Sequence, residues 1–298
     1  MSNRAIIITG PTASGKSDFA HKLALRINGA IINCDSVQIY AGIENISASP
    51  FAGRSVTDDI DGVPYRLFSV FSLDKHISVA DYLDLACKAM KEVIAMGKTP
   101  IFVGGTGYYI NVLLNGISSV PEVSEENRKR AREMVEKDID AARKMLPKDF
   151  DKTDPQRVAR ALEVFLETGK SLTEWQKIPR QGALVPDAFK ILVLPDRDVL
   201  LKRIAARIPQ MIHGGAEIEA KNIIANNYDA SRAIGAVQFC KILRGEATKQ
   251  DAVNDWITKT NQYAKRQRTW FRGQYPADYE INHIPNDDDI EKVIEKIS

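Results

Sequence analysis

Gly10-Pro11-Thr12-Ala13-Ser14-Gly15-Lys16-Ser17 is the stretch of this 298-residue chain that decides its fold. The apolar run 5–9 before it has the composition of a strand, and residues 18–26 after it have the apolar spacing of a helix. A strand, a glycine-rich turn and a helix in this order form the context that a P-loop requires. The stretch therefore predicts an α/β fold in which a parallel sheet is flanked by helices.

The same stretch predicts a diphosphate site, because its glycines let backbone N–H groups turn toward phosphate and the helix N-terminus favours negative charge. Lys16 is expected to reach the terminal phosphate, and the Ser17 hydroxyl is placed to bind Mg²⁺. The motif fixes the ligand class and leaves the reaction open. The predicted diphosphate-binding residues are Gly10, Pro11, Thr12, Ala13, Ser14, Gly15, Lys16 and Ser17.

A second apolar run, residues 30–34, predicts another buried strand that ends at Asp35. Ligands of open parallel sheets bind outside the carboxyl ends of the strands, so we expect Asp35 to face the phosphate loop from the neighbouring strand. A carboxylate there can orient or deprotonate a nucleophile, hold Mg²⁺ through water, or cap the next helix. Gln38 adds an amide suited to reading a base edge.

The strand predicted at 100–103 runs directly into a second glycine turn, Gly104–Gly107. A glycine turn between a strand and a helix places the Thr106 hydroxyl and nearby amides in the same crevice. An ATPase more often has an acidic residue at the end of this strand. Its absence makes ATP hydrolysis a less natural function, although Asp35 could take that part.

Residues 120–181 differ in character from the rest of the chain. A long, highly charged helical stretch over 122–146 contains Arg128, and a second helix begins after Asp154-Pro155 with Gln156, Arg157 and Arg160. We therefore predict a P-loop NTPase-like core made of 1–119 and 182–298, interrupted by an all-helical insertion domain at 120–181. The charges of this insertion either form a solvated face or offer a phosphate-binding edge.

Basic residues also gather in the last third of the chain. Arg203 and Arg207 lie four apart on a predicted helix, where they either clamp phosphates or form an exposed face. Residues 257–272 hold five basic residues and no acidic one, which is typical of a contact with a phosphate backbone. The aromatic residues Tyr263, Trp270 and Phe271 are expected to anchor this helix to the core.

The composition excludes several classes of protein. With 44% hydrophobic residues and a net charge of +2, the chain is expected to form a soluble globular core, and any basic surface must be local. No stretch approaches the roughly 20 apolar residues of a membrane span, so no membrane partner is expected. Three scattered cysteines argue against disulfides and for a reducing, cytoplasmic location, and the four histidines lack metal-site spacing.

Five motifs occur in a fixed order, at 10–17, 35–40, 103–107, 154–163 and 263–271. Together they resemble the bacterial tRNA dimethylallyltransferase family, also called IPP transferases, over about residues 4–275. The resemblance implies transfer of a dimethylallyl group from dimethylallyl diphosphate to the N6 amine of the adenosine immediately 3′ of the anticodon. The tRNAs concerned read codons that start with U, and diphosphate is released.

The resemblance also implies roles for individual residues. Thr12 to Ser17 would cradle the diphosphate with Mg²⁺, which Ser17 would hold; contact of Asp35 with Mg²⁺ through water stays the alternative given above. The catalytic residues would be Lys16, Asp35, which orients and deprotonates the adenine amine, and Thr106, which lies near the reacting carbon. The insertion domain would grip the anticodon stem-loop, and a monomer is expected. The implied tRNA contacts are Asp35, Ser36, Val37, Gln38, Thr106, Arg128, Gln156, Arg157, Val158, Ala159 and Arg160.

Two departures from the family pattern and two competing functions remain open. Gly235-Ala236-Val237 stands where the family often has a Gly-Tyr pair and a basic residue, so Arg232 or an arginine of the C-terminal basic helix is expected to substitute. Residues 45–50 match the family only loosely and lack a basic residue. The alternatives are a small-molecule or nucleoside kinase, with Arg203 or Arg207 on the γ-phosphate, and a non-catalytic P-loop RNA-binding module.

Overall fold

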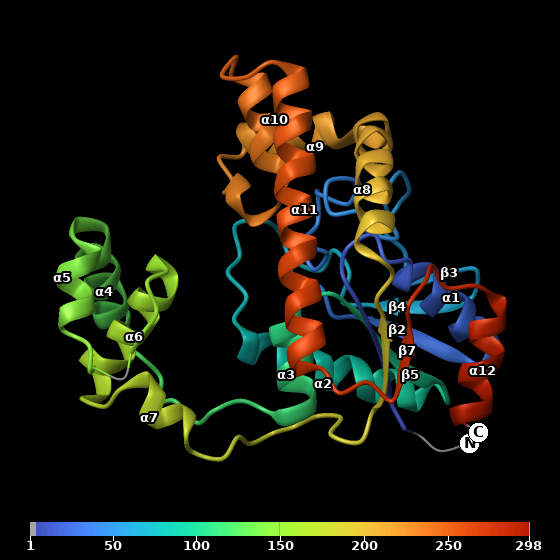
Figure 1. The fold of residues 1–298 in the computed structure, drawn as a ribbon, viewed down its shortest axis with the longest axis horizontal. Coiled ribbons are helices and arrows are strands. Elements are labelled where there is room, and N and C mark those ends of the chain that lie inside the picture. Colours follow the sequence, from blue (N-terminus) through green and yellow to red (C-terminus); the bar gives the residue numbers. More distant parts are fainter. Residues whose placement is uncertain (1–3, 149, 298) are drawn as a thin grey trace. The chain divides into compact units, whose positions relative to one another are not determined.

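A seven-stranded sheet organises the larger part of the computed structural model, which describes residues 4–148 and 150–297 (Figure 1). The strand order is β3-β4-β2-β5-β1-β6-β7. β3 pairs antiparallel with β4, and every other pairing between described strands is parallel. The α/β fold prediction is therefore confirmed. The strands are β1 Ile6–Thr9, β2 Gly29–Asn33, β3 Asp59–Ile60, β4 Val63–Arg66, β5 Thr99–Gly104, β6 Phe189–Val193 and β7 Tyr279–Ile281.

The order of the strands corrects one expectation about Asp35. β5 lies between β1 and β2, so Asp35 follows a strand that is not the neighbour of the P-loop strand. The register nevertheless brings the strand ends together, because Thr9 pairs with Gly104 and Asn33 pairs with Val103. The loops after β1, β2 and β5 therefore emerge at one edge of the sheet.

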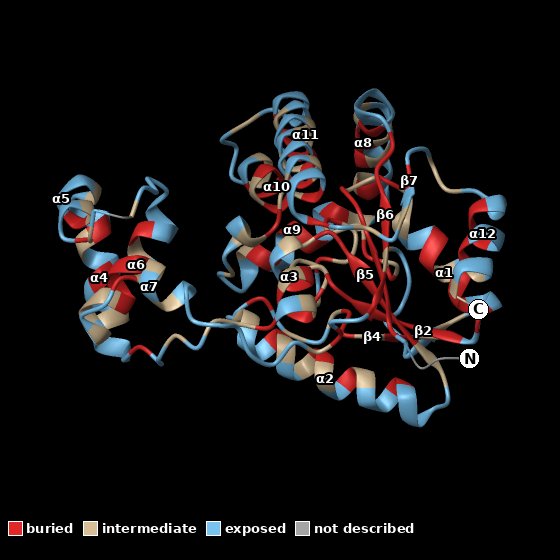
Figure 2. Ribbon diagram, turned by 60° about the horizontal axis from the view of Figure 1, so that its bottom comes forward, coloured by how far each residue is buried: buried red, intermediate tan, exposed pale blue. Residues whose placement is uncertain are grey.

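Helices cover both faces of this sheet. α1 and α12 contribute Leu23 and Val293 to a core that includes Ile8 and Ile191, while α2 contacts β2 and β5 on the opposite face (Figure 2). The central strands β1, β2, β5 and β6 are almost wholly buried, whereas β3 and β7 at the two edges are partly exposed. The helices of this unit are α1 Lys16–Arg26, α2 Val79–Ala95, α3 Gly107–Asn115, α8 Arg197–Met211, η1 Ile212–Ala216, α9 Glu217–Ala225, η2 Ala230–Arg232, α10 Ala236–Leu243, α11 Lys249–Gln274 and α12 Asp287–Ile297.

The chain divides into two compact units, and Asn115–Leu184 forms the smaller one. Its helices are α4 Glu125–Lys137, α5 Ile139–Lys144, α6 Pro155–Thr168 and α7 Leu172–Gln176, around a core of its own that includes Ala131 and Leu162. The continuous helix predicted over 122–146 is wrong. Asp138 has extended backbone angles, and its carboxylate accepts from the N–H groups of Asp140 and Ala141, so it ends α4 and caps α5. Within the described residues no helix is long and apolar enough to cross a membrane.

Candidate active site

A pocket of about 580 Å³ opens at the carboxyl edge of the sheet, within the larger unit. Residues 12–18 of the phosphate loop and residues 35–38 after β2 line it, together with segment 46–48. Side chains from α8, from residues 231–234 and from α11 complete the lining. The sheet edge that the sequence pointed to is therefore enclosed by helices from the last third of the chain.

The phosphate loop has the conformation that its glycines permit. Gly15 is the N-cap of α1 with φ at +91°, a left-handed angle that a side chain would strain. Immediately after it, Lys16 begins the helix, and its Nζ donates to the Pro11 carbonyl over 3.2 Å. The N-terminal turn of α1 thus faces the pocket, with its N–H groups and its partial positive charge available to an anion.

Two arginines of α8 donate hydrogen bonds to this loop. Arg203 Nε donates to the Ala13 carbonyl over 2.8 Å, and Arg207 Nη2 donates to the Thr12 hydroxyl over 2.7 Å. The sequence left these arginines open between an exposed face and a phosphate clamp. The structure places both beside the phosphate loop and in the pocket lining.

The pocket carries a surplus of positive charge. Burial lowers the pKa of Lys16 to about 8, against the opposing effect of Asp35 and with a further lowering by Arg207. Burial also lowers the pKa of Arg207 to about 10, and Arg203 adds to this lowering. Cations crowded in this way gain most from a multiply charged anion. The cationic lining residues are Lys16, Arg203, Arg207 and Arg232, and the acidic ones are Asp18 and Asp35.

Polar atoms without partners point to the same ligand. Four buried side-chain atoms of the pocket lining have no hydrogen-bond partner in the described part of the chain. Such atoms are rare in folded proteins, and each costs free energy until water or a ligand satisfies it. A polar ligand in this pocket would satisfy them. They are Ser14 Oγ, Arg207 Nε, Arg232 Nε and Thr260 Oγ1.

Asp35 uses one of its carboxylate oxygens within the protein. Oδ1 accepts from the N–H of Val37 over 2.9 Å and of Gln38 over 3.4 Å. The sequence allowed a helix cap here, but the residues that follow form a turn and not a helix, so Asp35 caps that turn. The second oxygen, Oδ2, makes no hydrogen bond to a described residue. One carboxylate therefore caps the turn and still presents an acceptor to the pocket.

Thr106 and Gln38 are already engaged in holding the loops. The Thr106 hydroxyl accepts from the N–H of Ser36 over 2.9 Å, which ties the turn after β5 to the loop after β2. Gln38 Nε2 donates to the carbonyls of Ser47 and Ala48, each over 3.1 Å. Its amide nitrogen therefore supports segment 46–48 of the pocket wall.

The oxygen donors present fit a phosphate-bound Mg²⁺ better than a protein-held metal. Ser17, Asp18 and Asp35 line the pocket and offer the hard oxygen ligands that Mg²⁺ prefers. Among the described residues no group of three or more His, Cys, Asp or Glu side chains could hold a metal ion. Mg²⁺ commonly takes phosphate oxygens, water and one or two protein ligands, which is the set available here.

One face of α11 lines the pocket, which the sequence reading missed in part. Trp256, Thr260 and Tyr263 lie on this face, and Tyr263 was expected to be a packing residue. Burial raises the pKa of the Tyr263 hydroxyl, with Asp35 as a further cause. The helical spacing of these three residues was the sequence signal that could have placed them on one face of the helix. Trp270 and Phe271 do pack: Phe271 is buried, and the Trp270 ring lies against Gly107.

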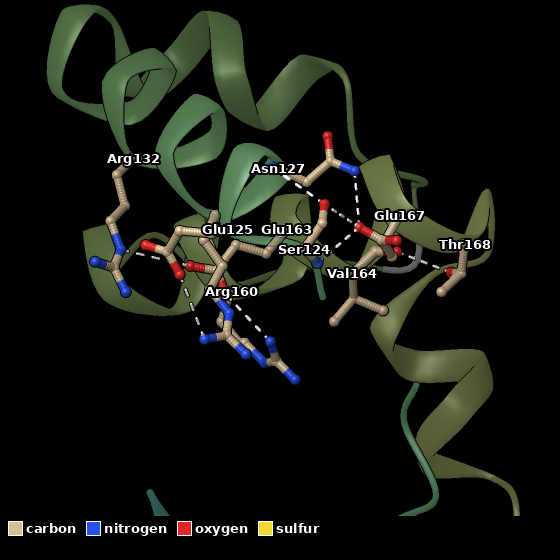
Figure 3. A network of polar contacts seen from close by, with 10 residues as sticks. Ser124, Glu125, Asn127, Arg132, Arg160, Glu163, Val164, Glu167 and Thr168 are labelled. Atoms are coloured by element: carbon tan, nitrogen blue, oxygen red, sulfur yellow. Dashed lines mark hydrogen bonds and ion pairs between the residues drawn. The ribbon is translucent and has the colours of Figure 1, made fainter. Parts of the chain in front are cut away.

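Two predicted RNA contacts of the smaller unit belong to a network of ion pairs (Figure 3). Glu163 is buried between two arginines: its carboxylate lies 3.1 Å from Arg160 Nη1 and 3.6 Å from Arg132 Nε. Arg128 pairs with Glu125 over 3.7 Å. The arginines of this unit are therefore partly neutralised and held in place by neighbouring carboxylates.

The remaining predicted contacts differ in exposure. Gln156 and Arg157 are exposed in the first turn of α6, and Arg157 makes no ion pair with a described residue. Ala159 is half-buried. Val158 is fully buried in the core of the smaller unit, so its side chain does not face solvent.

Comparison with known proteins identifies the family to which this chain belongs. The model of the family described as IPP transferase matches residues 38–274, and that of isopentenyl transferase matches residues 3–63. A tRNA dimethylallyltransferase of Rickettsia felis is 38% identical over 282 residues, which cover 90% of each chain. One of Rhizobium etli is 40% identical over 285 residues, covering 91% of this chain and 94% of the relative.

Solved structures lead to the same family. The tRNA isopentenylpyrophosphate transferase of Bacillus halodurans aligns with a TM-score of 0.70 and 29% identity, over 99% of this chain and 96% of its own. A eukaryotic dimethylallyltransferase acting on tRNA aligns with a TM-score of 0.71 and 26% identity, over 91% of this chain and 70% of its own. These matches do not favour a kinase or a non-catalytic module. The chain belongs to the IPP transferase family, that of the tRNA dimethylallyltransferases.

Proposed function

We propose that this enzyme transfers a dimethylallyl group from dimethylallyl diphosphate to the N6 amine of the adenosine 3′ of the anticodon in tRNA. The observation that carries the proposal is the pocket at the sheet edge, which combines a phosphate loop with buried cations on one side and a carboxylate on the other. Family membership supports tRNA prenylation. The proposal extends to the prenyl donor, the position on the base and the roles of the individual residues.

On the donor side, the first turn of α1, Lys16 and Arg207 would bind the diphosphate. The bond between the allylic carbon and the bridging oxygen breaks, and the electron pair leaves with the diphosphate, whose charge rises in the transition state. Lys16 and the loop N–H groups therefore stabilise the transition state more than the ground state. Mg²⁺ bound to Ser17 and the phosphate oxygens would supply further charge neutralisation.

On the acceptor side, Asp35 would receive the adenine amine. Its Oδ2 accepts an N–H from the exocyclic nitrogen, orients the lone pair toward the allylic carbon, and takes the proton as the nitrogen–carbon bond forms. Thr106 holds the Asp35 loop through Ser36. The adenosine must leave the stack to enter such a pocket, which costs least in a single-stranded loop.

The prenyl group needs an apolar wall, and the same pocket supplies one. Ile46, Ile234 and Trp256 line it beside the polar groups. A five-carbon chain placed against them would be shielded from water, which also protects the developing allylic cation from hydrolysis. The smaller unit would supply arginines to the phosphates of the tRNA.

One assay tests the proposal. The protein is mixed with Mg²⁺, labelled dimethylallyl diphosphate and unmodified tRNA in the absence of ATP, and label in the RNA is measured together with released diphosphate. We expect one diphosphate for each prenylated tRNA, and no transfer with tRNA whose adenosine next to the anticodon is replaced. ATP-dependent phosphate on an acceptor, with the prenyl donor untouched, would instead establish a kinase.

A further inference from the structure

Gln267 of α11 joins two loops that lie far from it in the sequence. The residue is buried, with 7% of its surface exposed. Oε1 accepts from the N–H of Thr12 over 2.8 Å, and Nε2 donates to the carbonyl of Gly105 over 2.8 Å. Both ends of a single buried amide are therefore satisfied, one by the loop after β1 and one by the turn after β5.

These two loops carry the two halves of the proposed reaction. Thr12 lies in the phosphate loop that would bind the diphosphate, and Gly105 directly precedes Thr106 on the acceptor side. Because Gln267 bonds both, its amide spans the gap between the leaving group and the threonine that braces Asp35. The bond to Thr12 also removes that N–H from the anion cradle and leaves the N–H groups of the following loop residues to the phosphates.

The surroundings are shaped for this amide. A Cβ on Gly105 would lie 2.4 Å from Gln267 Nε2, so a side chain there would collide with it. Among neutral side chains of this length, a primary amide alone offers a donor at one corner and an acceptor at the other. A methionine would fill the volume without either bond, and a glutamate would keep the acceptor and lose the donor.

We propose that Gln267 is a positioning residue for prenyl transfer, which fixes the distance between the phosphate loop and the acceptor side of the pocket. This inference rests on the proposed function. Misplacing reacting groups by about 1 Å can cost on the order of 100-fold in rate, so loss of the amide is expected to lower kcat. Substrate binding depends on other groups and is expected to change little.

The decisive variant is Gln267→Glu, because its effect should depend on pH. At high pH the carboxylate still accepts from Thr12 but repels the Gly105 carbonyl, so we expect kcat to fall by about 10- to 100-fold. Burial raises the pKa of a carboxyl group, against the lowering effect of the cations Lys16, Arg203 and Arg207 of the candidate active site. As the pH falls the carboxylate gains a proton, donates its O–H to Gly105 and restores both bonds. The ratio of variant to wild-type kcat should therefore rise between about pH 9 and pH 6.

Gln267→Met and two control variants complete the design. Gln267→Met lacks both bonds and should stay slow at every pH. Gln262 lies on the same helix with its side chain exposed, so Gln262→Glu and Gln262→Met should behave as wild type. Calorimetric binding of inorganic diphosphate and of tRNA to each variant reports whether both substrate sites remain intact.

The outcomes separate the two proposals. A kcat ratio of Gln267→Glu to wild type that rises as the pH falls, with unchanged KM values, supports positioning by the amide. Wild-type kcat in Gln267→Met, or a loss in Gln267→Glu that is the same at every pH, overturns it. If Gln267→Met does not fold, the pH profile of Gln267→Glu decides alone. A wild-type protein that transfers no prenyl group to tRNA refutes the proposed function instead.

Discussion

Arg207 of α8 reaches across to the phosphate loop, where its Nη2 lies 2.7 Å from the Thr12 hydroxyl oxygen. The same guanidinium keeps its Nε buried without a partner in the described chain, and burial lowers its pKa to about 10. A buried charge with an unsatisfied donor is costly until an anion pairs with it. This hydrogen bond joins Arg207, in the last third of the chain, to the phosphate loop near its start. The unsatisfied charge predicts that Arg207 binds the diphosphate.

We expect Arg207→Met to weaken diphosphate binding by about 10- to 100-fold, the scale of a lost hydrogen bond to a charged group. Methionine keeps much of the apolar stem and removes the charge. Calorimetric titration with inorganic diphosphate measures the effect. Arg197→Met, at the exposed start of the same helix, is the control. Unchanged diphosphate affinity in Arg207→Met would show that this arginine only braces the loop.

Donor binding should depend on pH through Lys16. Its amine has a pKa lowered to about 8, whereas a bound diphosphate favours the charged form and raises that pKa. Below about pH 8 the free enzyme already holds the proton. Above it, binding requires proton uptake, so the affinity for dimethylallyl diphosphate should fall as the pH rises through 8. Lys16→Ala has no amine to titrate and should lack this component. If wild type and Lys16→Ala show the same pH dependence of donor affinity, Lys16 is not its cause.

Asp35→Asn should slow prenyl transfer by about 100-fold or more, the usual scale for a lost general base. The amide oxygen can still accept from Val37, so the turn and both substrate affinities should be retained. Single-turnover transfer to tRNA measures the rate, and separate binding experiments measure the affinities. Near-normal transfer would remove Asp35 from the chemistry and leave it as a cap.

Local patterns were enough to predict the parts of the site that are contiguous in sequence. The strand, glycine turn and helix around Lys16 needed no tertiary information, and neither did the position of Asp35 after a strand. The partners of Gln267 and Arg207 could not be found this way, because they lie 255 and 195 residues away in the chain, although Arg207 was already a candidate phosphate clamp. For the same reason the position of β5 between β1 and β2 was not predicted, because strand order is set by packing and not by local composition.

The charged helices of the smaller unit show a related limit. Arginines there could be counted from the sequence, but their partners could not. Glu163, which lies one turn after Arg160 on α6, also binds Arg132 of α4. The capping aspartate at 138, which splits the predicted long helix, acts on the residues that follow it and was readable in principle. The many charged residues on both sides of Asp138 made this cap hard to distinguish in the sequence.

The ion pairs of this unit predict that its arginines contribute unequally to tRNA binding. Arg157 is exposed and makes no ion pair within the described chain, whereas Arg160 is paired with buried Glu163. A phosphate contact by a free arginine releases about one counterion, so Arg157→Ala should weaken tRNA binding and reduce the salt slope by about 0.7 to 0.9. Arg160→Ala should reduce the slope less, because its charge is already partly neutralised.

Filter binding of tRNA at several salt concentrations measures both slopes. Lys144→Ala, an exposed lysine of α5 outside the predicted contacts, is the control and should leave the slope unchanged. The affinity for dimethylallyl diphosphate should be the same in all three variants, since the pocket that would bind it belongs to the larger unit. Equal slopes in Arg157→Ala and wild type would mean that this face of α6 is a solvated surface, and that the tRNA contacts of the enzyme lie elsewhere.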